Sequence, residues 1–221
     1  MSVSRIFLAL GLVAAIGACA PQPEPAQSLP DDQIAAQAYR HDGPASLTLY
    51  TMVNNSNGSG AHTSLMVNAS QRVIFDPAGS FRHPRIATKN DVVYGVTPVM
   101  EDTYTRFHAR ETFHVIVQQV EVSPEVAEAV LRRILVAGPV PRAQCALSTS
   151  SLLRDVPGFG DAIRTTWFPN QLAEQFGNLP GATTQRLYEY DDPDRFKALE
   201  SFDPDRVRAS RAAQEAAAAA E

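Results

Sequence analysis

Residues 60–76 read GAHTSLMVNASQRVIFD. Two strand-forming runs, 62–67 and 72–76, are separated by four small or polar residues, and this pattern predicts a hairpin of two antiparallel strands. Further strands, each bounded by turn-forming residues, are predicted at 46–53, 91–96 and 112–122, with an edge strand at 183–190. The sequence therefore predicts an antiparallel sheet.

The hydrophobic period changes from two to 3.6 residues at Ser123. Ser123 and Pro124 are the residue types of a helix cap and a first helical position, and the apolar stripe that follows ends at Gly138. Two shorter helices are predicted, one that begins at Cys145 and one at 169–176. Strands followed by helices are typical of the α+β class, which is the fold class that the sequence predicts.

Length and charge limit the classes of function. The chain has 221 residues, with 19 Lys and Arg against 24 Asp and Glu, so its formal net charge is -5. A length in this range is usual for one domain with terminal extensions. Nucleic-acid binding needs clustered basic residues that neutralise phosphates, and this composition argues against it. The sequence predicts no nucleic-acid partner.

The N-terminus has the pattern of an export signal. Arg5 precedes the apolar run 6–16, which is shorter than the roughly 20 residues that a membrane-spanning helix needs. Residues 16–19, Ile-Gly-Ala-Cys, resemble the bacterial lipobox, in which the cysteine becomes lipidated and N-terminal after cleavage. The sequence therefore predicts a lipoprotein that is attached to a membrane through Cys19.

An ordinary secretory signal, cleaved near Ala18 or Ala20, is the alternative. Both readings place the domain outside the cytoplasm, and the lipobox predicts a lipid-anchored protein of the bacterial cell envelope that faces the periplasm or the outside. The chain divides into a signal peptide (1–18), a lipidated cysteine with a flexible Pro-rich tether (19–40), a folded domain (41–190) and a charged, Ala-rich tail (191–221).

Cys145 is the second of two cysteines and has no intramolecular partner if Cys19 carries lipid. One interpretation is a buried, inert thiol, for which free cysteine is well suited. The other is a nucleophile, because the N-terminus of a helix and a neighbouring imidazolium both favour a thiolate. His62 and Asp76 lie in adjacent predicted strands, so Asp76 can orient the His62 ring toward Cys145.

The order of these residues resembles a known family. Residues 60–67 (GAHTSLMV), 73–81 (VIFDPAGSF), 145–153 (CALSTSSLL) and 167–172 (WFPNQL) are similar, in this order, to the circularly permuted branch of the NlpC-type papain-like cysteine hydrolases. The resemblance covers about residues 45–180. It implies a permuted papain-like domain with Cys145 as nucleophile, His62 as general base and Asp76 as the orienting residue.

The resulting functional hypothesis is a thiol hydrolase or acyltransferase that acts on an amide, ester or thioester through an acyl-Cys145 intermediate. The family and the location suggest a cell-wall peptide as substrate, with a lipid acyl group as the second choice. The competing hypothesis is a non-catalytic envelope lipoprotein that uses the same fold for binding or assembly.

No cofactor or metal is predicted. The remaining histidines lack the spacing of a metal motif, and these are His41, His83, His108 and His114.

Overall fold

The computed structural model describes residues 30–82, 86–189 and 194–200. Its strands form one sheet in the order β4-β5-β3-β2-β1-β6-β7, and every neighbouring pair is antiparallel. The strands are β1 (Ser46–Asn54), β2 (Gly60–Asn68), β3 (Arg72–Phe75), β4 (Thr88–Lys89), β5 (Val92–Val93), β6 (Phe113–Glu121) and β7 (Thr183–Leu187). The predicted α+β class and antiparallel sheet are confirmed.

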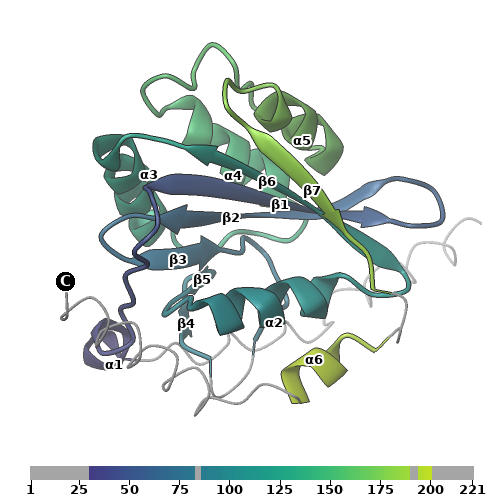
Figure 1. The fold of residues 1–221 in the computed structure, drawn as a ribbon, viewed down its shortest axis with the longest axis horizontal. Helices are drawn as coiled ribbons and strands as arrows, with labels where there is room; N and C mark the ends of the chain where they lie inside the picture. Colours follow the sequence, from purple (N-terminus) through teal and green to yellow (C-terminus); the bar gives the residue numbers. More distant parts are fainter. Residues whose placement is uncertain (1–29, 83–85, 190–193, 201–221) are drawn as a thin grey trace, which may run out of the picture.

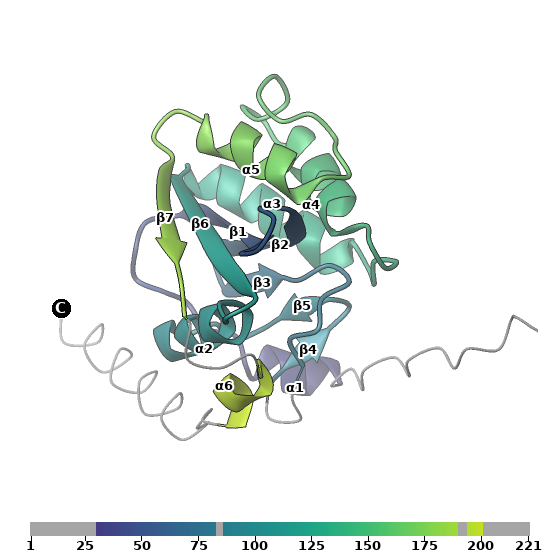
Figure 2. The ribbon, with the colours of Figure 1, turned by 90° about the vertical axis from the view of Figure 1, so that its right-hand side faces the viewer.

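Helices cover both faces of this sheet (Figures 1 and 2). On one side lie α3 (Pro124–Val136), α4 (Cys145–Arg154) and α5 (Pro169–Gly177), and on the other lie α2 (Pro98–His108) and α6 (Phe196–Glu200). A short helix, α1 (Asp31–Ala35), precedes the sheet.

Strand alternation divides the core in two, because successive side chains of a strand point to opposite faces. In β2, Leu65 and Val67 belong to the cluster that packs with α3, α4 and α5, whereas Met66 belongs to the cluster that packs with α2. His62 and Ser64 lie an even number of residues from Met66, so their side chains point to the same face of the sheet. The side chain of His62 therefore points toward the α2 face.

The predicted hairpin is confirmed, since β2 and β3 pair from Asn68 opposite Arg72 to Leu65 opposite Phe75. The predicted helix at Ser123 is also confirmed, and its Ser123 side chain accepts a hydrogen bond from the amide of Val126.

The strand predicted at 91–96 is wrong over most of its length, because only Val92–Val93 is extended and paired. Asn90 and Asp91 have φ angles of 49° and 61°, so the chain makes a tight turn immediately before this short strand. At the other end Gly95 has a φ of 68°, and the chain turns into α2.

Helix α2 was not predicted from the sequence. Its cap is Thr97, whose Oγ1 accepts a hydrogen bond of 3.2 Å from the Met100 amide, and Pro98 occupies the first turn. Ser123 and Pro124 show the same signal in α3. The cap signal of α2 is less conspicuous because the apolar and polar residues that follow it are not separated as clearly onto two faces of the helix.

Both ends of the predicted domain extend further than the sequence indicated. Residues 30–40 were expected to belong to the flexible tether, yet Ile34 and Tyr39 are buried and the Tyr39 carbonyl accepts a 2.6 Å hydrogen bond from Arg72. At the C-terminal end, Leu199 of α6 is buried in the α2 core cluster. Short amphipathic segments of this kind are hard to recognise because each buries only one or two side chains.

The signal peptide, Cys19 and the Ala-rich end of the tail lie outside the described residues. Within the part that is described, no helix is both long and apolar enough to span a bilayer.

We predict that Thr97→Val lowers the free energy of unfolding by about 1 kcal/mol, because it keeps the side-chain shape and removes the acceptor that caps α2. Urea denaturation measures this change. Thr183→Val, on the exposed strand β7, is the control and is expected to change the same quantity by less than about 0.5 kcal/mol. Equal effects of the two variants would contradict the capping role.

Candidate active site

The hairpin brings His62 and Asp76 together. Pairing between β2 and β3 ends at Leu65 and Phe75, so Asp76 follows the last paired residue of β3 while β2 continues past it with His62. His62 Nε2 lies 2.8 Å from Asp76 Oδ1. Asp76 is buried, and the His62 side chain is 18% exposed. The predicted pairing of these two residues is present in the structure.

Cys145 is the first residue of α4 and lies against the free side of β2 beyond the end of β3. Its thiol lies close enough to the His62 ring for the two groups to shift each other's pKa. Because Nε2 of that ring is bonded to Asp76, the nitrogen that faces the thiol is Nδ1. The backbone N–H groups of Thr63 and Ala146 also lower the pKa of Cys145. All three predicted site residues therefore meet in one place.

The electrostatics of this group favour an ion pair. Burial would raise the pKa of Cys145, but the hydrogen bond and charge of His62, with the two backbone N–H groups, lower it. Burial would lower the pKa of His62, but its bonds to Asp76 and Cys145 raise it. Burial would raise the pKa of Asp76, and its bond to His62 lowers it instead. The three shifts together stabilise a thiolate, an imidazolium and a carboxylate.

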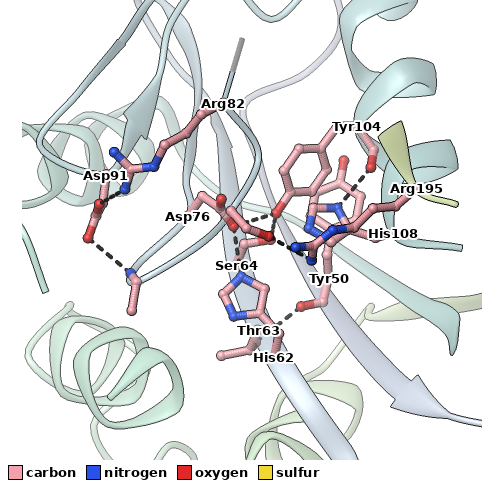
Figure 3. Close-up of polar contacts among 12 residues, drawn as sticks. Tyr50, His62, Thr63, Ser64, Asp76, Arg82, Asp91, Tyr104, His108 and Arg195 are labelled. Atoms are coloured by element: carbon pink, nitrogen blue, oxygen red, sulfur yellow. Dashed lines mark hydrogen bonds and ion pairs between the residues drawn. The ribbon is translucent and has the colours of Figure 1, made fainter. Parts of the chain in front are cut away.

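Tyr104 of α2 completes the surroundings of Asp76 (Figure 3). Its hydroxyl lies 2.8 Å from Asp76 Oδ1 and 2.7 Å from Ser64 Oγ. A tyrosine hydroxyl has one proton, so it donates to the carboxylate and accepts from the Ser64 hydroxyl. Sequence reasoning missed Tyr104 because it missed α2, although the cap at Thr97 was a signal for that helix.

His108, at the end of α2, stacks on His62 with ring centroids 6.0 Å apart and an interplanar angle of 23°. Its Nδ1 donates a 2.9 Å hydrogen bond to the Tyr104 carbonyl, and its Nε2 is buried with no hydrogen-bond partner among the described residues. Burial lowers the pKa of His108 to about 4. His108 is therefore a neutral neighbour of the His62 imidazolium.

A metal ion is the obvious alternative use of these side chains. His62, Asp76 and His108 each offer one ligand atom, and these atoms lie within 4.8 Å of one another. The direct bond between His62 and Asp76 engages one ligand atom of each residue, and the second ring nitrogen of His62 faces Cys145, which favours a hydrogen-bonded site over a metal centre. Of the other histidines considered, His41 binds the Gly43 amide and His114 binds Asn55. His83 lies outside the described residues.

Comparisons of this chain with protein-family models, with curated proteins and with solved structures found no match. The interpretation of the site therefore depends on its own geometry.

Asp91 joins the two loops that carry the site. Its carboxylate Oδ2 accepts 2.9 Å hydrogen bonds from the amides of Ala78 and Val140, and its backbone carbonyl accepts one of 2.8 Å from the Asp76 amide. Arg82 donates to Oδ1 at 2.9 Å (Figure 3). One buried carboxylate thus holds the segment after β3 against the loop that leads into α4.

We predict that Gly79→Ala slows alkylation of Cys145 about tenfold at about pH 6, because it displaces the Asp76 carboxylate that orients His62. A Cβ atom at Gly79 would lie 1.8 Å from Asp76 Oδ2. The rate with iodoacetamide measures the effect. Gly181→Ala is the control, since nothing lies within 4 Å of its added Cβ and only stability should fall. Unchanged reactivity of the Gly79 variant would contradict the role given to Asp76.

We also predict that Asp91→Asn lowers the free energy of unfolding by about 2 kcal/mol, because buried charge-assisted hydrogen bonds are replaced by weaker ones. Thermal or urea denaturation measures the loss. Arg82→Gln removes only the more exposed ion pair of the same carboxylate and should cost less than about 1 kcal/mol. A larger loss in the Arg82 variant would show that the ion pair, rather than the two amide contacts, holds the loops.

Proposed function

We propose that the protein is a thiol hydrolase or acyltransferase that acts on an amide, ester or thioester through an acyl-Cys145 intermediate. The observation that carries this proposal is the 2.8 Å bond between His62 and Asp76 at the start of the helix that begins with Cys145, where all three pKa shifts favour the charged forms. An inert buried cysteine has no need of an oriented imidazolium. A nucleophilic thiol needs one.

The proposed reaction has two steps. The Cys145 thiolate attacks the carbonyl carbon, the bond to the leaving oxygen, nitrogen or sulfur breaks, and the proton on His62 Nδ1 moves to the leaving atom. Water or another acceptor then attacks the acyl-Cys145 carbonyl while His62 takes up its proton. Release of the acyl group regenerates the thiolate and the imidazolium.

The start of α4 supports stabilisation of the oxyanion. The first amides of a helix have no acceptor within the helix, and their partial positive charge favours a negative oxygen. We assign one oxyanion contact to the Cys145 amide, because this amide belongs to the same residue as the attacking sulfur.

We further propose that the fold is the permuted papain-like arrangement of the NlpC-type hydrolases. In support, the histidine strand β2 and the acid after β3 precede the helix that begins with Cys145, and that helix packs against β2. The motif 167–172 follows, with Trp167 and Phe168 exposed before α5.

The location and substrate remain proposals from the sequence. The lipobox at 16–19 supports lipid attachment at Cys19 and a position in the bacterial cell envelope. A cell-wall peptide is the substrate class that suits this location, with a lipid acyl group as the second candidate.

Alkylation of Cys145 as a function of pH tests the proposal. In a chain that begins at Ala20, Cys145 is the one remaining thiol. We predict that at about pH 6 the native chain reacts at least about tenfold faster than His62→Ala, because the native thiolate persists below the ordinary cysteine pKa of about 8.5.

The pKa shifts of Cys145 and His62 determine how the alkylation rate depends on pH. Reactivity rises with pH through the lowered pKa of Cys145, and the ion pair lasts until the raised pKa of His62 is reached. His62→Ala should move the rise to higher pH. Slow alkylation that is unaffected by this substitution would favour the competing hypothesis of a binding or assembly module. Cys145→Ser should abolish turnover of any substrate.

A further inference from the structure

A pocket of about 530 Å³ opens beside His62 on the α2 face. Its walls are the ends of β1 and β2, the loop after Asp76, the end of α2 with the residues that follow it, and the segment that leads into α6. Met52, Phe107, Phe113 and Phe196 make much of the lining apolar. The pocket is therefore suited to an apolar group of the substrate.

The position of the pocket relative to the site residues decides which part of the substrate it takes. His62 and His108 line it, whereas Cys145 reaches His62 from α4 on the other side of the sheet and is not among the lining residues. In thiol catalysis the histidine gives its proton to the leaving atom, so the leaving group must lie on the histidine side. The acyl group stays with the sulfur.

The charge of the pocket indicates what the leaving group carries. Among the described residues that line it, Arg110 and Arg195 are cationic and Asp194 is the one carboxylate. The Arg195 guanidinium lies 5.3 Å from the Phe107 ring centroid and 5.2 Å from that of Phe196. It also donates a 3.0 Å hydrogen bond to Ser80 Oγ. These contacts hold a cation at the wall of an apolar pocket (Figure 3 draws Arg195 near His108).

We propose that this pocket binds the leaving group, and that the leaving group is an alcohol or amine fragment with an apolar body and an anionic substituent, which Arg195 binds. This inference rests on the proposed function. In the acylation step the Sγ–carbon bond forms, the bond from the carbonyl carbon to the leaving oxygen or nitrogen breaks, and that atom takes the His62 proton. The released fragment then leaves through the pocket.

Two esters of one carboxylic acid test the proposal, a neutral 4-nitrophenyl ester and a 3-carboxy-4-nitrophenyl ester. They form the same acyl-Cys145 and differ only in the leaving group. Stopped-flow measurement on the full chain in detergent separates acylation, seen as a burst of nitrophenol, from deacylation, seen as the steady rate.

We predict that Arg195→Gln slows acylation by the carboxylated ester about tenfold, which corresponds to the lower range of a charge-assisted hydrogen bond. Acylation by the neutral ester should change by less than about twofold. Deacylation should be unchanged because both esters give the same intermediate. Arg195→Lys, which keeps the charge, should restore part of the loss. Arg132→Gln, on the exposed side of α3, is the matched control and should change neither rate.

Three results would overturn the proposal. If Arg195→Gln slowed acylation by both esters equally, the charge of the leaving group would have no role in binding. A changed deacylation rate would mean that the pocket holds the acyl group instead. If neither ester is cleaved in a reaction that depends on Cys145, the proposed function itself is wrong and the pocket assignment falls with it.

Discussion

The hydrogen bond between His62 Nε2 and Asp76 Oδ1 is the contact on which the rest of the site depends. It fixes which ring nitrogen faces Cys145, and it supplies the negative charge that offsets the cost of burying an imidazolium. Tyr104 donates to the same carboxylate oxygen, and the turn at Gly79 leaves no space for a larger residue. A change at Tyr104 or Gly79 therefore acts on the thiol through Asp76.

The sequence was sufficient to predict the helices and strands that have a clear local sequence signal. The hairpin from 60 to 76, the helix capped by Ser123 and the helix that begins at Cys145 each combine a clear hydrophobic period with a recognisable boundary, and the structure confirms them. The meeting of His62, Asp76 and Cys145 was also predicted, because neighbouring antiparallel strands leave few arrangements for the first two.

The parts that escaped prediction depend on tertiary packing. Tyr104 and His108 come from α2, a helix whose buried face is partly polar and whose pattern is therefore weak. Their role follows from the position of α2 across the sheet, which no local pattern specifies. The carboxylate of Asp91 is a similar case, since its partners at Ala78 and Val140 are 13 and 49 residues away in the chain.

The different lengths of β2 and β3 decide at which stage of folding the pKa of Cys145 is lowered. The free side of β2 near Thr63 is covered only when α4 arrives from much later in the chain, so the sulfur meets its imidazole as a long-range contact. Until then Cys145 has the pKa of an ordinary cysteine and is mostly protonated at neutral pH. Packing of α4 against β2 is thus the folding step that lowers the pKa of Cys145.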